Sequence, residues 1–82
     1  MSVTIYTTNY CPYCSAAKRL LHSKGVSFQE VNVEDDPEKR KWLTEVTGQK
    51  TVPQIFIHDQ SIGGYQELVA LERSGKLDNM LK

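Results

Sequence analysis

The sequence Cys11-Pro12-Tyr13-Cys14 contains the only two cysteines of the 82-residue chain, separated by two residues. Cysteines at this spacing form a CxxC pair, which can cycle between a dithiol and a disulfide. A disulfide across so short a loop constrains the unfolded chain little, so it is a poor structural staple. The pair therefore indicates electron transfer between thiols and disulfides.

The residues around the cysteine pair predict that it lies between a strand and a helix. Residues 3–6 are β-branched or aromatic, which is typical of a strand. After the pair, Pro12 suits the first turn of a helix and Gly25 suits its end. Apolar residues recur between them at the spacing of one buried helix face: Ala17, Leu20 and Leu21.

This position gives the two cysteines different expected roles. The unpaired N–H groups and the dipole of a helix N-terminus stabilise an anion, so they lower the pKa of a thiol placed there. We expect Cys11 to be the exposed catalytic nucleophile and Cys14, one turn further on, to be the more buried resolving thiol. Cα atoms three residues apart in a helical turn lie about 5 to 6 Å apart, which a disulfide can span.

The middle of the chain predicts a second strand and a second helix. Residues 26–33 alternate apolar and polar side chains, as in a strand with one buried face. A helix should begin near Asp36 and Pro37 and run to about Thr47, with Gly48 at its end. Its buried contacts are expected from three apolar side chains: Trp42, Leu43 and Val46.

A β-hairpin and a last helix complete the expected fold. Residues 54–57 and 61–62 are predicted strands on either side of residues 58–60. A helix follows Gly63-Gly64 and closes at Gly75, before a last apolar turn. The order βαβαββα predicts an α/β fold: a four-stranded mixed sheet with the first two strands parallel, an antiparallel hairpin and helices on both faces. We expect residues 1–82 to form one domain.

The composition restricts the partners and the location of the protein. Ten Lys and Arg residues balance ten Asp and Glu residues, so the chain as a whole offers no basic surface for nucleic acid or an acidic membrane. The first residues lack a basic segment followed by an apolar one, and no run of about 18 apolar residues occurs. A cytoplasmic protein is therefore expected.

The cysteine pair has two other interpretations. It can be half of a zinc site, but structural zinc needs four ligands, and only His22 and His58 remain as candidates. Both histidines fall where solvated surface residues are expected, so no metal site is predicted. The other alternative is a pair of inert buried cysteines, which a position between strand and helix disfavours.

Two further segments have features of a binding site. If the Val52-Pro53 bond is cis, the Val52 backbone turns outward, and its N–H and C=O can pair with an extended peptide. An ordinary trans proline at a strand start is the alternative. The segment Gly63-Gly64-Tyr65-Gln66-Glu67 opens a helix, and either the N–H groups of that helix meet a carboxylate or the glycines only form a tight turn into it.

Together the three segments resemble those of dithiol glutaredoxins, which have the thioredoxin fold. CPYC at 11–14, TVP at 51–53 and GGY at 63–65 occur in the order and at the separations of that family, over essentially the whole chain. The resemblance implies a glutathione-dependent oxidoreductase that reduces protein disulfides and glutathione mixed disulfides. Cys11 would attack the disulfide, Cys14 would resolve intramolecular disulfides, and glutathione would return the electrons. The resemblance implies a monomer without a metal, with ribonucleotide reductase as one candidate target.

The resemblance also implies a glutathione site. Eight residues would form it: Tyr13, Thr51, Val52, Pro53, Gly64, Tyr65, Gln66 and Glu67. Tyr13 would lie against the tripeptide, and Val52 would pair through its backbone with the cysteine of glutathione. Helix N–H groups would meet the γ-glutamyl carboxylate, and Glu67 would be available to the ammonium.

The chain departs from the family pattern at two places. Thr8 stands where relatives commonly carry a lysine that stabilises the thiolate and meets the glycine carboxylate of glutathione. Gln66-Glu67 replaces a frequent Ser-Asp or Asp-Asp pair, and Lys50 is a candidate substitute for the missing cation. We expect weaker glutathione binding and a less depressed Cys11 pKa than in lysine-bearing relatives.

Two alternative functions are compatible with the same cysteine pair and the same fold. One is a dimer that carries a [2Fe-2S] cluster on one Cys11 from each chain and two glutathiones. Pro12 stiffens the turn after Cys11, which disfavours this arrangement. The other is an electron donor to ribonucleotide reductase that thioredoxin reductase reduces, which the glutathione-site segments disfavour.

Overall fold

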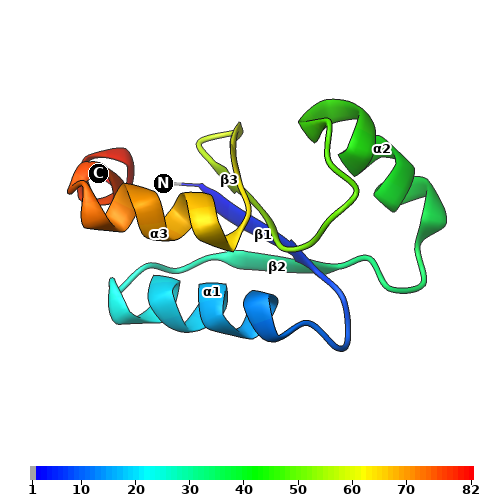
Figure 1. Ribbon diagram of the computed structural model, residues 1–82, viewed down its shortest axis with the longest axis horizontal. Coiled ribbons are helices and arrows are strands. Elements are labelled where there is room, and N and C mark those ends of the chain that lie inside the picture. Colours follow the sequence, from blue (N-terminus) through cyan, green and yellow to red (C-terminus); the bar gives the residue numbers. More distant parts are fainter. Residues whose placement is uncertain (1) are drawn as a thin grey trace.

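The structure is a computed structural model that describes residues 2–82. Its elements follow in the order β1 (Val3–Thr7), α1 (Pro12–Ser23), β2 (Gln29–Asn32), α2 (Pro37–Thr47), β3 (Gln54–Ile57), β4 (Gln60–Gly63), α3 (Tyr65–Arg73) and α4 (Lys76–Met80) (Figure 1). The predicted order βαβαββα is confirmed, and the last apolar turn is the short helix α4. Strand β2 is shorter than the predicted segment 26–33. Val26 and Val33, at the two ends of that segment, are buried but lie outside β2, and no residue within β2 is fully buried.

The four strands form one mixed sheet in the order β2-β1-β3-β4. β1 runs parallel to β2, with Tyr6 opposite Val31, and antiparallel to β3, with Ile5 opposite Ile55. β3 and β4 are an antiparallel hairpin. The parallel pair is joined through α1, so the first part of the chain is a βαβ unit. The sheet topology therefore agrees with the prediction.

The hairpin turn is tighter than the sequence predicts. His58 and Asp59 have φ values of 51° and 64°, so both are in the left-handed region. Two central residues with positive φ are typical of a two-residue type I′ turn, whose twist matches that of the flanking strands. Gln60 consequently belongs to β4, and the predicted three-residue connection 58–60 is wrong by one residue.

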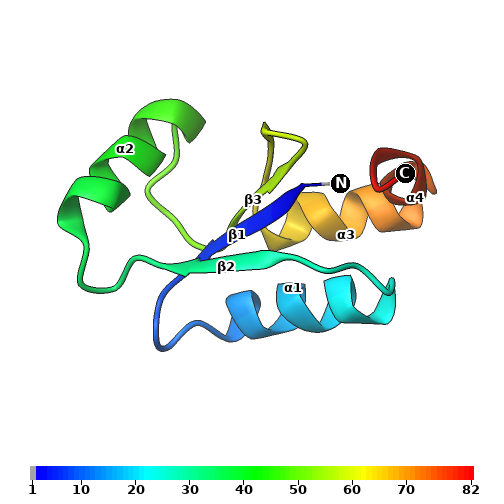
Figure 2. The same ribbon diagram turned by 180° about the vertical axis from the view of Figure 1, so that it is seen from behind.

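One face of the sheet carries the main core. Ile5, Ile55 and Ile57 point toward α1, α3 and α4, and their main partners are four fully buried side chains: Ala17, Leu21, Leu68 and Leu77. Helix α1 runs along the sheet and α3 lies beside it, whereas α2 stands apart from both (Figure 2). Within residues 2–82, no helix has the length and apolar character that a membrane span requires.

Helix α2 covers the opposite face. Because successive strand residues point to opposite faces, Tyr6 and Phe56 lie on the far side from Ile5 and Ile55. The Trp42 ring lies 5.8 Å from that of Tyr6 and 6.3 Å from that of Phe56, measured between centroids. Helices on both faces are thus confirmed.

The predicted buried contacts of α2 are only partly correct. Leu43 is buried, but Trp42 is 42% exposed and Val46 is 48% exposed. The reason is that α2 buries only Leu43 among residues 37–47, so the side chains on either side of Leu43 stay partly in solvent. Trp42 keeps its sheet contact through one side of its ring, and Lys39 Nζ lies 5.4 Å from the ring centroid.

Candidate active site

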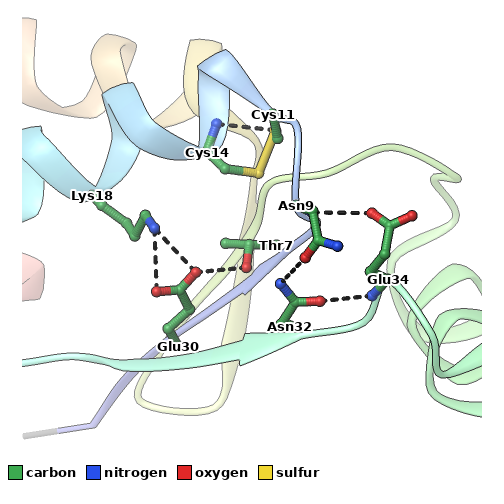
Figure 3. Close-up of polar contacts among 8 residues, drawn as sticks. All are labelled: Thr7, Asn9, Cys11, Cys14, Lys18, Glu30, Asn32 and Glu34. Carbon is green, nitrogen blue, oxygen red and sulfur yellow. Dashed lines mark hydrogen bonds and ion pairs between the residues drawn. A yellow bond between two sulfur atoms is a disulfide. The ribbon is translucent and has the colours of Figure 1, made fainter.

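The two cysteines lie at the N-terminus of α1, as the sequence predicts. Cys11 is the N-cap residue, and its Sγ accepts a hydrogen bond from the Cys14 N–H at 3.1 Å. The two side chains are joined by a disulfide, with Cα atoms 5.1 Å apart (Figure 3). Cys11 is partly exposed, whereas Cys14 is only 2% exposed. An incoming molecule can therefore reach the Cys11 sulfur more readily than that of Cys14.

The backbone of Val52 lies beside Cys11. The Val52–Pro53 peptide bond is cis, and the Val52 carbonyl oxygen lies 3.7 Å from Cys11 Sγ. Val52 precedes β3, and within the described residues neither its N–H nor its C=O makes a backbone hydrogen bond. An extended ligand can therefore form hydrogen bonds with Val52 next to the reactive sulfur.

A groove of about 590 Å³ begins at this point. It is bounded by the first turn of α1, the loop before β3 and the first turn of α3. Ten residues line it: Tyr13, Gln49, Lys50, Thr51, Val52, Pro53, Gly64, Tyr65, Gln66 and Glu67. All eight residues of the expected glutathione site are among them, and Lys50 is as well. Gln49 was missed, although its position on the same loop as Thr51 would have indicated it.

Two tyrosines form one wall of the groove. The rings of Tyr13 and Tyr65 have centroids 5.8 Å apart and planes at 33°. Tyr13 is 61% exposed, so one side of its ring is free to contact a ligand. Exposed aromatic rings in a groove supply apolar contact area at a low cost in side-chain entropy.

The glycine pair brings the start of α3 close to Pro53. A Cβ at Gly64 would lie 3.2 Å from the Pro53 carbonyl oxygen, and one at Gly63 would lie 2.7 Å from Glu67 Oε1. Gly63 also has a φ of 100°, which side chains rarely adopt. Without side chains at these positions, Glu67 folds back, and its Oε1 accepts a hydrogen bond from the Gly64 N–H at 2.7 Å. The carboxylate of Glu67 therefore caps α3 at the edge of the groove.

Hydrogen bonds hold the loop that precedes Cys11. The Asn9 N–H donates to Glu34 Oε1 at 3.0 Å, and Asn32 Nδ2 donates to Asn9 Oδ1 at 2.9 Å (Figure 3). Asn32 Oδ1 in turn accepts from the Glu34 N–H at 2.9 Å. These bonds fix the segment that carries Thr8 and Tyr10 to the loop after β2.

A charged network lies at the end of β1. Thr7 Oγ1 donates to Glu30 Oε2 at 2.8 Å, and Lys18 Nζ lies 3.1 Å from the same oxygen (Figure 3). The Thr7 hydrogen bond is the main reason that the pKa of Glu30 is lowered, and Lys18 adds to the effect, while burial opposes it. Lys18 is one helical turn after Cys14, so the network adjoins the helix that carries the cysteine pair.

The histidines lie away from these features. His22 is exposed near the end of α1, with its ring centroid 5.1 Å from that of Phe28, and His58 is exposed in the hairpin turn. In the part of the chain that the structure describes, no three side chains of the metal-binding types His, Cys, Asp and Glu lie together.

A model of the glutaredoxin family matches residues 3–62. The chain belongs to the glutaredoxin family. It is 53% identical to a glutaredoxin of Pseudomonas aeruginosa over 96% of this chain and 94% of the relative. As a glutaredoxin, it is a thiol-disulfide oxidoreductase with the thioredoxin fold.

Solved glutaredoxin structures resemble the whole fold. The solution structure of a glutaredoxin from Brucella melitensis has a TM-score of 0.91 and 48% identity, and the match covers 100% of this chain and 89% of that one. The crystal structure of a buckwheat glutaredoxin–glutathione complex has a TM-score of 0.90 and 35% identity, covering 96% of this chain and 74% of that one. The glutaredoxin resemblance identified from the sequence is confirmed.

Proposed function

We propose that this glutaredoxin reduces protein disulfides and glutathione mixed disulfides with electrons from glutathione. The main support is the groove, because all eight residues of the expected glutathione site line it and it adjoins Cys11 through Val52. The buckwheat relative, which binds glutathione, has a closely similar fold. We propose a monomeric cytoplasmic enzyme with oxidised or glutathionylated proteins as partners.

The reaction begins with the Cys11 thiolate. With a glutathionylated protein, Cys11 attacks the glutathione sulfur, so a Cys11–glutathione disulfide forms and the protein thiolate leaves. The thiolate of a second glutathione then attacks the glutathione sulfur of this mixed disulfide. Oxidised glutathione leaves, and the Cys11 thiolate is regenerated. This route does not require Cys14.

Cys14 acts on disulfides within or between proteins. Cys11 attacks one sulfur of the target, which forms a mixed disulfide and releases the other target sulfur as a thiolate. The Cys14 thiolate then attacks the Cys11 sulfur and releases the target in its dithiol form, while the Cys11–Cys14 disulfide closes. Two glutathione molecules return the enzyme to the dithiol form and leave as oxidised glutathione.

The lining of the groove matches the charges of glutathione. The tripeptide carries a carboxylate at each end and an ammonium group at the γ-glutamyl end. We assign the γ-glutamyl end to the start of α3, where backbone N–H groups and Glu67 can bind its carboxylate and ammonium. Lys50, in the loop before β3, is available to the glycine carboxylate. The Val52 backbone binds the cysteine between them.

The proposal is tested by comparing substrates with and without the glutathione tripeptide, and by comparing electron donors. The purified protein should reduce a glutathionylated peptide with glutathione, glutathione reductase and NADPH, and the rate should saturate with the glutathionylated peptide. The same peptide blocked with a small thiol that lacks the tripeptide should be reduced more slowly. Equal rates for the two peptides, or reduction of the enzyme by thioredoxin reductase without glutathione, would contradict the proposal.

A further inference from the structure

Gln54, the first residue of β3, is a polar side chain inside the protein. It is fully buried, and it follows Pro53 directly. Its Nε2 donates to Gln49 Oε1 at 2.9 Å and to the Thr51 carbonyl oxygen at 3.0 Å, and it lies 3.3 Å from Thr51 Oγ1. All of these contacts are with the loop that forms one side of the groove.

The other end of the Gln54 amide has no partner. Its Oε1 is buried and makes no hydrogen bond within the described residues. A buried acceptor without a donor lowers stability, whereas an apolar side chain of similar length would avoid this cost. The cost of this acceptor offsets part of what the Nε2 hydrogen bonds contribute to stability. The donors of Gln54, however, are fully used by the groove loop.

These donors orient the peptide group between Thr51 and Val52. The peptide is planar, and among the described residues only the Val52–Pro53 bond is cis. In a trans peptide the C=O and N–H groups point in opposite directions. Because Gln54 Nε2 binds the Thr51 C=O, the N–H of Val52 must point away from Gln54, and Val52 itself lines the groove.

The loop is held from its other end as well. Thr47 Oγ1 accepts from the Gln49 N–H at 3.1 Å and donates to the Leu43 carbonyl oxygen at 2.7 Å. Gln49 is thus tied through its backbone to α2 and through its side chain to Gln54. The loop is fixed at both ends, and Gln54 is the contact that comes from the sheet.

We propose that Gln54 is a positioning residue for ligand binding in the groove. By binding the Thr51 carbonyl, it keeps the Val52 N–H directed at the backbone of the ligand beside Cys11. This role rests on the proposed function, because the ligand is taken to be glutathione. Gln54 itself touches neither the ligand nor the reacting sulfurs.

Binding can be measured without chemistry in a Cys11→Ser background. S-methylglutathione is titrated by calorimetry into this parent protein, into Cys11→Ser/Gln54→Met and into Cys11→Ser/Gln60→Met. Met keeps the length of the side chain and removes both the donor and the acceptor of the amide group. Gln60 is an exposed glutamine of β4, so its variant is the matched control. We expect about tenfold weaker binding for the Gln54 variant, as for one lost hydrogen bond, and an unchanged Kd for the control.

Thermal unfolding separates positioning from a structural role. The Gln54→Met variant should unfold close to the temperature of its parent, because it removes an unpaired buried acceptor together with the Nε2 hydrogen bonds to the loop, and these two effects oppose each other. Weaker binding together with a clearly lower Tm would assign Gln54 a structural role only and overturn the proposal, as would unchanged binding. If the parent itself shows no saturable binding, the proposed glutathione site fails, and the role of Gln54 fails with it.

A second variant, Gln54→Glu, should restore a hydrogen bond from residue 54 to the loop when its carboxyl group is protonated. Gln54→Glu has the shape of glutamine, but its carboxylate cannot donate a hydrogen bond, whereas the protonated acid donates one. Relative to the Cys11→Ser parent at the same pH, binding should be weak near about pH 8 and recover toward about pH 5, because burial raises the pKa of a carboxyl group. A binding deficit that does not change with pH would contradict the proposal.

Discussion

The Cys14 N–H points at Cys11 Sγ from a distance of 3.1 Å. When the pair is reduced, this donor faces the sulfur that the proposed mechanism requires as a thiolate. Hydrogen bonds from a helix N-terminus stabilise the thiolate relative to the thiol. The first turn of α1 is therefore positioned to stabilise a thiolate, and Thr8, three residues before Cys11, adds no cation.

Adding a cation at position 8 should increase the acidity of Cys11. We expect Thr8→Lys to lower the Cys11 pKa, because a nearby ammonium favours the thiolate. The pH dependence of iodoacetamide alkylation measures this pKa, with Cys14→Ser in both proteins so that one thiol titrates. Thr8→Gln is the control for size without charge. An unchanged pKa in Thr8→Lys would show that position 8 does not act on the thiolate.

Two variants of Glu67 should separate its capping from its charge. Glu67→Gln keeps an oxygen that accepts from the Gly64 N–H, whereas Glu67→Ala removes it. We expect Glu67→Ala to lower the free energy of unfolding by about 1 kcal/mol and Glu67→Gln to lower it by less. Both should weaken glutathione binding, because both remove the negative charge near the ligand ammonium. Equal stability of the two variants in urea would argue against the capping role.

Lys50 should act on one end of the ligand only. We expect Lys50→Gln to weaken binding of S-methylglutathione several-fold, about as much as one exposed ion pair contributes. An analogue with an amide in place of the glycine carboxylate should bind Lys50→Gln and the parent equally. Lys41→Gln, on the exposed surface of α2, is the control. If the analogue also discriminates between the two proteins, the assigned orientation of glutathione is wrong.

The hydrogen bond from Thr7 to Glu30 should make the stability of the protein depend on pH in the acidic range. The folded pKa of Glu30 lies below its ordinary value of 4.5, so this interaction stabilises the protein above that pH and is lost as the pH falls through the folded pKa. We expect Thr7→Val to lower the free energy of unfolding near neutral pH by about 1 kcal/mol. The difference from wild type should shrink as the pH falls below 4.5. Thr4→Val, on the same strand, controls for the change of side chain; a difference that persists in acid would contradict the account.

Short-range patterns in the sequence predict most of the fold. The spacing of Ala17 and Leu21 identifies the buried face of α1 because that face lies on the sheet over its length. The same reasoning fails for Val46, which is 48% exposed, because α2 buries only Leu43 among residues 37–47. Helical periodicity shows which side chains share a face, but the width of the contact depends on how the helix is placed.

The site was predictable as far as its residues form local motifs. The cysteine pair, the Val52–Pro53 bond and the glycine pair are short motifs of at most five residues. The physical reason for each motif can be stated from the sequence alone. Gln54 belongs to no such motif. It is a polar residue at the start of an otherwise apolar strand, and its hydrogen-bond partners lie in a loop whose path is known only from the folded structure. Asn9 and Glu34 are 25 residues apart, and their contact likewise depends on two loops meeting in space.

The central claim is that Cys11 alone carries out the reduction of glutathione mixed disulfides, with Cys14 needed only for other disulfides. The direct measurement is the turnover of a glutathionylated peptide with glutathione and glutathione reductase, in wild type, Cys11→Ser and Cys14→Ser. We predict no activity above background for Cys11→Ser and retained activity for Cys14→Ser. Activity in Cys11→Ser, or its loss in Cys14→Ser, would contradict the account.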